Sequence, residues 1–224
     1  MIGKKKVPDE SNADERAVWL SARSTIVIAT GNTDKIAEIR GLLTGVPFDL
    51  LGLNEFVDVE EIEETGCTFE KNAILKATGY ASQTGLLALA DDSGLEVNAI
   101  DGRPGVLSAR YGGDGLNFSG KMSALLEEMK DSANPDRRAR FVCSMVLADQ
   151  TGRILFTAEG ECRGIIAHVP QGNGGFGYDP IFIPDGFDRT FGQLPASVKA
   201  RISHRAKAGK KILRYLLGFT GIST

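Results

Sequence analysis

Two pairs of adjacent acidic residues are the groups in this chain best suited to chemistry. Asp91-Asp92 follows the short apolar stretch 86–90, and Glu63-Glu64 lies in the segment 54–70, which contains seven acids and no base. Two neighbouring carboxylates repel each other, which costs stability unless a cation or a proton relieves the repulsion. Hard oxygen ligands of this kind suit Mg²⁺, which would also bridge substrate phosphates. Alternatively, the aspartates form a plain turn with the serine and glycine behind them, and the glutamates a solvated face.

The loop Thr30-Gly31-Asn32-Thr33-Asp34-Lys35 has the composition of a phosphate-binding site. It lies between a β-branched apolar run and a stretch with helical spacing. Backbone N–H groups at a helix start, together with a hydroxyl, an amide and a lysine, can cradle an anion. The loop lacks the second glycine and the Lys-Ser/Thr pair of a Walker A motif. A capped turn between strand and helix explains the same residues equally well.

A glycine-rich segment, Gly172 to Pro180, contains four glycines around Phe176, Tyr178 and Asp179. Glycines allow the backbone to approach a flat ligand closely, and Phe176 offers a face on which a base can stack. A flexible linker would not contain aromatic residues and proline at such density. The segment therefore indicates a binding loop, although it does not name the ligand.

The end of the chain is strongly basic. No acidic residue follows Asp188, while seven basic residues lie between positions 199 and 214. His204-Arg205 stands where the final helix is predicted to begin, and the free N–H groups of a helix start favour anions. A solvated basic face is the alternative interpretation. A nucleic-acid surface is less well supported, because no aromatic residue interleaves with the basic ones before Tyr215.

Hydrophobic periodicity predicts the elements that position these residues. Helix-type spacing and β-type runs alternate, and a hairpin is expected around Gln150-Thr151-Gly152. Because βα units and a hairpin coexist, we expect an α/β fold with a mixed sheet. The predicted strands are 25–30, 48–53, 86–90, 140–148 and 153–160, and the predicted helices are 34–43, the segment after the cap Thr68, 122–129 and 203–217.

Composition restricts the class of protein. The chain of 224 residues has a formal net charge of -3, which indicates no general polyanion-binding surface. No apolar run approaches the ~20 residues that span a bilayer. The three cysteines form no C-x-x-C pair, so we expect small buried residues of a cytoplasmic protein rather than a zinc site. Residues 1–24 are expected to be a disordered extension, 25–219 a single domain and 220–224 a tail.

Taken together and in this order, six segments of the chain resemble the inosine triphosphate pyrophosphatase family, the dITP/XTP pyrophosphatases. The similarity runs from Thr25 to about Leu217. Any one segment could occur by chance, whereas six in register are highly specific. The segments are Ala29–Lys35, Glu63–Gly66, Ala90–Leu95, Pro104–Tyr111, Gly174–Pro180 and Ile202–Arg205.

The resemblance implies an elongated two-lobed α/β fold, with a central mixed β-sheet flanked by helices and an active-site cleft between the lobes. It implies hydrolysis of the non-standard purine nucleotides ITP, dITP and XTP to the monophosphate and pyrophosphate, which cleanses the nucleotide pool. Mg²⁺ dependence and a homodimer are implied as well. No stable binding of nucleic acid or membrane is expected.

The same resemblance assigns roles at the metal and phosphate end of the site. Asp92 is expected to be the general base, and Asp92 with Glu64 or Asp91 is expected to hold the metal. The loop Thr30–Lys35 is expected to bind the phosphates, and two further residues would assist it, Ser93 and Lys199.

At the other end, Phe176-Gly177-Tyr178-Asp179 is expected to enclose the base, and His204-Arg205 to contact its edge. Arginine only donates hydrogen bonds and histidine can donate, so both suit the O6 acceptor of hypoxanthine and neither suits the 6-amino group of adenine. Guanine also carries O6, so its rejection depends on contacts to its 2-amino group that these residues do not reveal.

Three positions depart from the pattern of the family. Lys71 stands where bacterial members commonly have Glu, and Val198 and Ala200 flank Lys199 where Glu and Asn are frequent. Lys199 itself is retained. The carboxylate common at position 71 and the polar neighbours of Lys199 are therefore replaced in this chain.

Two other functions compete with this interpretation. A related house-cleaning pyrophosphatase of the septum type would act on modified pyrimidines, but its usual signatures are absent and His204-Arg205 argues against it. A non-catalytic nucleotide- or RNA-binding module would use the basic end of the chain. Such a module has no need of Asp91-Asp92 beside a phosphate loop.

Overall fold

A computed structural model describes residues 25–113 and 115–220. The expected N-terminal extension, 1–24, and positions 221–224 of the expected tail lie outside these residues. The described chain contains one six-stranded sheet in the order β2-β1-β3-β4-β5-β6. β1 pairs in parallel with β2 and β3, whereas all other neighbours are antiparallel, so the predicted mixed sheet is confirmed. The strands are β1 (Thr25–Ile28), β2 (Asp49–Gly52), β3 (Leu87–Val97), β4 (Arg138–Ala148), β5 (Ile154–Ile166) and β6 (Phe182–Pro184).

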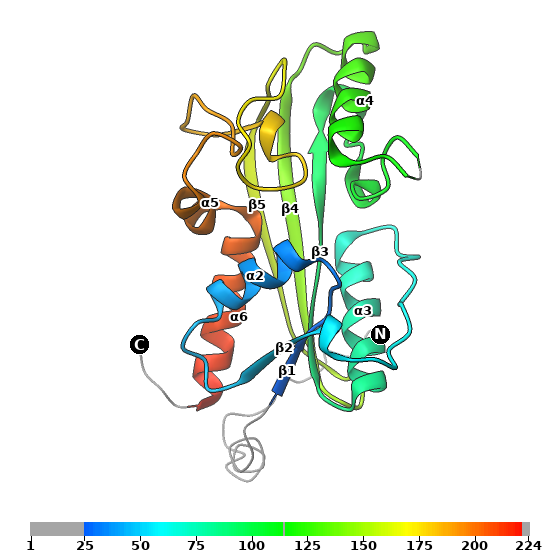
Figure 1. Ribbon diagram of the computed structural model, residues 1–224, viewed down its shortest axis with the longest axis vertical. Coiled ribbons are helices and arrows are strands. Elements are labelled where there is room, and N and C mark those ends of the chain that lie inside the picture. Colours follow the sequence, from blue (N-terminus) through cyan, green and yellow to red (C-terminus); the bar gives the residue numbers. More distant parts are fainter. Residues whose placement is uncertain (1–24, 114, 221–224) are drawn as a thin grey trace, which may run out of the picture.

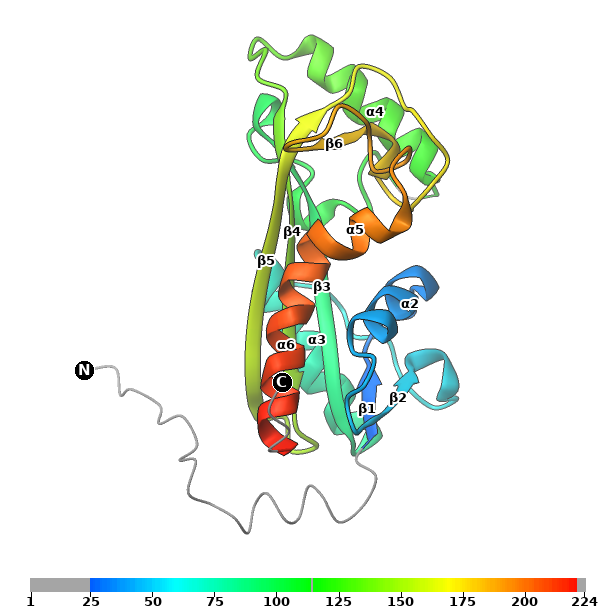
Figure 2. The ribbon, with the colours of Figure 1, turned by 90° about the vertical axis from the view of Figure 1, so that its left-hand side faces the viewer.

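Three long strands, β3, β4 and β5, run along the whole molecule (Figures 1 and 2). The lower lobe consists of β1, β2 and three helices around the lower half of these strands, and the upper lobe of α4, β6 and the neighbouring loops around their upper half. The elongated two-lobed architecture is therefore confirmed. The helices are α2 (Thr33–Leu42), α3 (Phe69–Thr84), α4 (Phe118–Asp131), α5 (Ala196–Ile202) and α6 (His204–Thr220), with short 3₁₀ turns η1 (Leu53–Glu55), η2 (Asn98–Ile100), η3 (Gly105–Leu107) and η4 (Asp179–Ile181).

The alternation of side chains along β3 decides what each face of the lower sheet contacts. Leu87 and Leu89 pack in a core with residues of α2 and α6, whereas Ala88 and Ala90 pack against the alanines of α3. α2 and α6 thus cover one face of the lower sheet and α3 covers the other. A third core fills the upper lobe around α4 and the upper ends of the long strands.

Helix starts follow the predicted capping chemistry. The Thr68 side chain accepts a hydrogen bond from the Lys71 N–H at 3.2 Å and caps α3, as expected. The α3 residues Phe69, Ala73, Ala77 and Ala81 are buried, as their spacing of four predicts. The predicted hairpin is also present, because β4 and β5 pair along their length and turn at residues 149–153.

The predicted end of the strand at residue 90 and the alternative turn at residues 91–94 are both wrong. Asp91 and Asp92 neither end a strand nor form a turn, because β3 continues to Val97. The register of β3 and β4 pairs Asp91 with Met145 and Gly94 with Val142 without interruption. Aspartate, serine and glycine favour turns locally, but pairing with β4 and buried ion pairs outweigh that preference here.

The predicted final helix, 203–217, is confirmed as α6, whereas the short helix α5 before it was not predicted. Ser203 separates the two helices and ends α5 in an extended conformation. The Ser203 hydroxyl accepts a hydrogen bond from the Ala206 N–H at 3.1 Å, so Ser203 is a cap, as expected. A β-carbon on Gly160 of β5 would lie 2.2 Å from the His204 carbonyl, so a glycine is needed where α6 begins against the sheet.

The lower part of β5 is an edge whose carbonyl groups have partners. Lys207 Nζ of α6 donates to the Glu161 carbonyl at 2.8 Å, and Lys211 Nζ donates to the Glu159 carbonyl at 2.7 Å. Further up, the Arg163 carbonyl accepts from the Asp185 N–H at 2.9 Å beside β6. Part of the basic run therefore binds the backbone of the neighbouring strand. Among the described helices, none has the length and apolarity required to span a membrane.

Candidate active site

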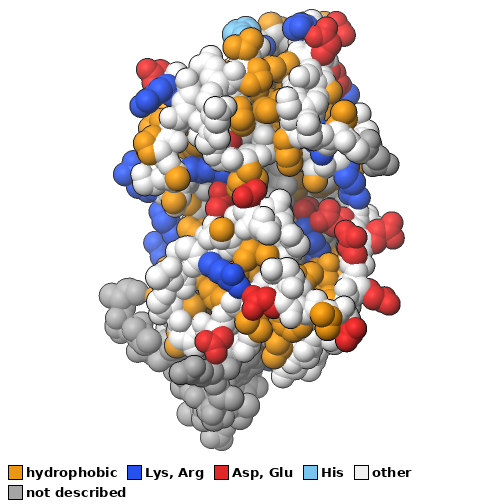
Figure 3. Space-filling view, in the orientation of Figure 1, with side chains coloured by type: hydrophobic (Ala, Val, Ile, Leu, Met, Phe, Trp, Pro, Cys, Tyr) orange, Lys and Arg blue, Asp and Glu red, His pale blue; other side chains and the backbone are white. Residues whose placement is uncertain are grey.

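Two adjoining hollows form a cleft between the lobes, and charged side chains of both signs gather around it at mid-height (Figure 3). The inner chamber extends toward the glycine-rich segment, and the larger outer chamber extends toward the phosphate loop and the acidic segment. Because they share four lining residues, a single ligand can occupy both. The shared residues are Asn32, Lys35, Glu64 and Ala109.

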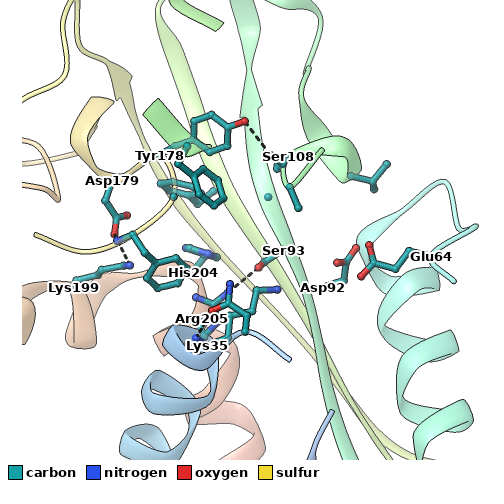
Figure 4. Close-up of a pocket in the computed structure, with 18 residues that line it drawn as sticks. Lys35, Glu64, Asp92, Ser93, Ser108, Tyr178, Asp179, Lys199, His204 and Arg205 are labelled. Atoms are coloured by element: carbon teal, nitrogen blue, oxygen red, sulfur yellow. Dashed lines mark hydrogen bonds and ion pairs between the residues drawn. The ribbon is translucent and has the colours of Figure 1, made fainter. Parts of the chain in front are cut away.

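The predicted phosphate loop lies at the C-terminal end of β1, beside the middle of β3. Thr30, Gly31, Asn32 and Lys35 line the outer chamber, whereas Thr33 and Asp34 line neither chamber. The Asn32 side chain caps α2 by accepting hydrogen bonds from the N–H groups of residues 34 and 35 at 3.0 and 3.1 Å. The cap orients the first turn of α2, so that Lys35 points into the cleft (Figure 4).

Asp91 is buried on the α2/α6 face of β3. Its Oδ2 lies 2.9 Å from Arg205 Nη2 and 3.3 Å from Lys35 Nζ, and it also accepts from the Ser93 hydroxyl at 3.1 Å. Burial alone would raise the pKa of Asp91, but Lys35 and Arg205 outweigh it and hold the pKa well below its usual range. Asp91 is therefore a permanent anion paired with cations. It points to the opposite side of the strand from Asp92 and Glu64.

Asp92 lies on the α3 face, at the border of the two chambers. Its Oδ2 accepts from Asn72 Nδ2 at 3.1 Å, and its Oδ1 lies 3.0 Å from Lys76 Nζ. Burial raises the pKa of Asp92, and the nearby charge of Glu64 adds to this, while Lys76 counteracts part of the effect. A carboxylate with a raised pKa accepts a proton more readily, which suits a general base.

The carboxylates of Glu64 and Asp92 form a place for a cation. Lys76 Nζ lies 2.7 Å from Glu64 Oε1 and 3.0 Å from Asp92 Oδ1, so an ammonium group stands between the two acids. Figure 4 shows both carboxylates side by side. No group of three or more acidic, histidine or cysteine side chains that could hold a metal occurs in the described chain. Two carboxylates suit Mg²⁺, which uses few protein ligands together with substrate phosphates and water.

The glycine-rich segment forms the far wall of the inner chamber. A β-carbon on Gly175, whose φ is 70°, would lie 2.0 Å from Asp179 Oδ2, so this position requires glycine. Asp179 Oδ2 accepts from the Phe176 N–H at 2.8 Å and fixes the loop. The Tyr178 hydroxyl donates to the Ser108 carbonyl at 3.0 Å, so Tyr178 braces the wall. Phe176, Gly177, Tyr178 and Asp179 all line the chamber, and that they enclose the base stays a prediction.

Lys199 lies in the inner chamber beside the glycine-rich segment, not beside the phosphate loop. Its Nζ lies 2.6 Å from Asp179 Oδ2, 2.9 Å from Glu38 Oε1 and 4.0 Å from the centre of the Phe176 ring. A contact between Lys199 and phosphate stays a prediction. In the structure, Lys199 holds the glycine-rich segment to α2.

Arg205 uses most of its hydrogen-bonding capacity within the protein. Its Nη1 lies 2.6 Å from Glu38 Oε2, its Nη2 bonds to Asp91 and to the Ser93 hydroxyl, and its side chain is only 2% exposed. Burial would lower the pKa of Arg205, but the Asp91 and Glu38 charges raise it instead. The guanidinium ties α6 to β3 and α2 beneath the inner chamber.

His204 is the polar group of the inner chamber with unused capacity. It is buried and stacks on Phe141 at 4.8 Å, and its Nδ1 has no hydrogen-bond partner within the described residues. Burial, with the charges of Arg205 and Lys199, lowers the pKa of His204 well below its ordinary value. The imidazole is therefore neutral. A buried polar atom without a partner indicates that a ligand supplies one.

Sequence reasoning missed three residues of this network. Asn72 and Lys76 of α3 hold Asp92, and Glu38 of α2 holds both Lys199 and Arg205. Asn72 and Lys76 are four residues apart on a helix whose alanines are buried, so their shared face was the available signal. Glu38 follows Lys35 by one helical turn, but nothing local indicates its partners.

The three departures from the family pattern lie away from the chambers. Lys71 Nζ contacts Cys67 Sγ at 3.5 Å, Val198 packs against the upper core, and Ala200 is exposed. Cys67 itself is exposed, so the expectation of three buried cysteines is wrong for it, whereas Cys143 and Cys162 are buried as expected.

Comparison with known proteins identifies relatives whose sequences are similar over most of the chain. Residues 26–215 match the model of the Ham1 family. The chain is 45% identical over 197 residues to a dITP/XTP pyrophosphatase of Geobacter sulfurreducens, which covers 88% of this chain and 98% of the relative. It is 43% identical over 200 residues to the protein of that name from Streptomyces coelicolor, covering 86% and 98%.

Solved structures agree. A HAM1 protein from Coxiella burnetii superposes with a TM-score of 0.81 at 39% identity, covering 87% of this chain and 99% of that one. The Ham1 protein of Staphylococcus aureus gives a TM-score of 0.77 at 37% identity, with coverage of 87% and 99%. An α/β fold with a cleft between two lobes defines the class, and the chain belongs to the Ham1 family. The predicted resemblance is confirmed.

Proposed function

We propose that the protein is a Mg²⁺-dependent pyrophosphatase that hydrolyses ITP, dITP and XTP to the nucleoside monophosphate and pyrophosphate. One observation carries the proposal: Asp92 and Glu64 meet at the border between a chamber with a stacking ring and a chamber with a phosphate loop. A base in the inner chamber and a triphosphate in the outer chamber put the phosphate chain beside these carboxylates. Relatives named dITP/XTP pyrophosphatases support the same function.

Asp92 and Glu64 would hold the Mg²⁺, and the proposal leaves Asp91 out because Oδ2 of Asp91 pairs with Arg205 and Lys35 on the other face of β3. When bound, the metal supplies charge neutralisation for the phosphate oxygens and favours deprotonation of water. Asp92 takes the proton of the attacking water, and the bond between the α- and β-phosphates breaks to release pyrophosphate. Lys35 contributes positive charge beside the phosphates.

The base is enclosed by Phe176 and Asp179, and His204 selects it. A neutral His204 can donate one hydrogen bond to O6 of hypoxanthine or xanthine. Against adenine, that donor would meet an amino group and stay unpaired. Ser93 and Arg205 would form the floor of the inner chamber under the sugar and phosphates. Arg205 Nη2 donates to the Ser93 hydroxyl at 2.8 Å and fixes its position. A homodimer in the cytoplasm completes the proposal and rests on membership of the family.

The first test is release of pyrophosphate from a panel of nucleoside triphosphates with and without Mg²⁺. We expect turnover of ITP, dITP and XTP that depends on the metal and far exceeds turnover of ATP and GTP. Pyrophosphate, rather than orthophosphate, should appear in a ratio of one to one with the monophosphate. Equal turnover of ATP and ITP, or no loss on chelation, would contradict the proposal.

A second test concerns the selection of the base. We expect His204→Phe, which keeps the stacking contact with Phe141, to lower kcat/KM for ITP and leave kcat/KM for ATP unchanged or raised. A lost hydrogen bond and a donor left unpaired are each worth about 1–3 kcal/mol, which corresponds to a change in the ITP/ATP ratio of roughly 5- to 150-fold. Phe156→Leu, beside Tyr215 in the lower lobe, is the control for altered aromatic packing. An equal loss on both substrates would assign His204 to the fold.

A further inference from the structure

Arg110 belongs to a segment shared with the family, Pro104–Tyr111, and the site described so far gives the Arg110 side chain no task. Its backbone N–H donates to the Leu107 carbonyl at 2.9 Å, directly after η3, so the segment is held as a compact turn of the upper lobe. Ala109 and Arg110 both line the outer chamber. The neighbouring Tyr111 packs against the upper core, so Arg110 reaches this chamber from the upper lobe, whereas the phosphate loop belongs to the lower lobe.

The order of the two chambers fixes where the parts of a triphosphate would lie. With the base against Phe176, the α-phosphate lies at the shared border, near Asp92. The β- and γ-phosphates then lie in the outer chamber, beyond the residues that enclose the base. Three cationic residues line the outer chamber in the described structure, and they are Lys35, Lys76 and Arg110.

These cations differ in how far the protein already neutralises them. Lys76 lies within 3.0 Å of two carboxylates, and its side chain is 9% exposed. Lys35 lies 3.3 Å from Asp91 and is 16% exposed. Arg110 Nη2 lies 3.9 Å from Oε2 of its acidic partner, Glu64, and the Arg110 side chain is 49% exposed. An ion pair this long and this exposed contributes little, so Arg110 can exchange its partner at small cost.

We propose that Arg110 binds the β- and γ-phosphates of the substrate and therefore the pyrophosphate that leaves. This inference rests on the proposed function. A guanidinium presents parallel N–H groups that match two phosphate oxygens at once, and it stays charged at any physiological pH. Glu64 is the residue that Arg110 would release, because the proposed function directs that carboxylate to Mg²⁺. The triphosphate is then held from both lobes, by Lys35 below and by Arg110 above.

The test compares two ligands that reach different parts of the site. Inorganic pyrophosphate probes the outer chamber, and inosine monophosphate probes the inner chamber and the shared border. Their dissociation constants are measured by calorimetry with Mg²⁺ present, for the wild type and for Arg110→Gln. We expect pyrophosphate to bind roughly 10- to 150-fold more weakly to the variant, the range for a lost charged hydrogen bond. Binding of inosine monophosphate should stay within twofold.

Arg189→Gln is the matched control. Arg189 also has a single ion pair of 3.9 Å, with Asp188, and is 58% exposed, but it lines neither chamber. It should bind both ligands as the wild type does. Arg110→Lys, which keeps the charge and loses the fork, should recover only part of the affinity for pyrophosphate.

Unchanged affinity of Arg110→Gln for pyrophosphate would overturn the assignment, and so would an equal loss for inosine monophosphate. Either result, with a wild type that hydrolyses ITP, leaves the proposed function intact. A wild type that neither hydrolyses ITP nor binds pyrophosphate would overturn the proposed function itself. Melting temperatures of all variants are measured alongside, and we expect them to match because the two side chains changed, Arg110 and Arg189, are exposed.

Discussion

Asp92→Asn is expected to lower kcat for ITP by on the order of 10²-fold or more, which is the usual contribution of a general base. The amide keeps the shape of the side chain and can still bond to Asn72, but it cannot take a proton from water. KM is expected to change much less, because the proposed contacts to the base and to the phosphates are made mainly by other residues. The measurement is steady-state kinetics across a range of Mg²⁺ concentrations.

The range of Mg²⁺ separates two ways in which Asp92 could act. If the loss were only one of metal affinity, turnover would recover at saturating Mg²⁺. Near wild-type turnover under those conditions would rule out Asp92 as the base. Asp188→Asn, at a side chain that is 97% exposed, is the control for removal of one carboxylate and should keep full activity.

Arg205→Ala is expected to lower the free energy of unfolding by about 3–5 kcal/mol, the cost of removing one partner from a buried ion pair. The guanidinium is 2% exposed and binds Asp91 and Glu38, which would be left without their main cation. Urea denaturation measures the loss. Arg214→Ala, at an exposed position of the same helix, should change stability by less than about 0.5 kcal/mol.

The pH dependence supplies an independent check on this pair. The pKa of Asp91 is lowered in the folded state, so its pairing stabilises the fold above the ordinary aspartate pKa of about 3.9 and is lost as the pH falls below it. The stability difference between wild type and Arg205→Ala should therefore shrink in acid. A difference that is constant between pH 7 and pH 3 would contradict the role of Asp91.

Local patterns were sufficient for most elements of the fold. The spacing of Ile36 and Ile39, the cap at Thr68 and the hairpin around residues 150–152 each depend on neighbours within a few positions. Such signals are written in the sequence itself. The length of β3 is different, because residues 91–97 are held in a strand by pairing with β4, some fifty residues away.

The site divides in the same way. Motif residues such as Asn32, Asp92 and Phe176, which the sequence singles out, all line the inner chamber, while their roles stay predictions. The ion-pair partners of these charged residues were not predictable from the sequence. Lys76 meets its carboxylates, and Glu38 its two cations, only when the chain folds. Asp91 and Asp92 have different partners because they point to opposite faces of β3. This could be predicted only by knowing that the strand continues through both residues.

The lysines of α6 along β5 restrict how two copies of this chain can meet. An open strand edge offers unpaired carbonyls to any passing strand, and proteins commonly protect such edges with charged residues. Here the Glu159 carbonyl already accepts from Lys211, the Glu161 carbonyl from Lys207 and the Arg163 carbonyl from the Asp185 N–H. A second subunit cannot continue the sheet there unless both lysines withdraw. Any dimer of this chain would therefore have to form through a surface other than this edge.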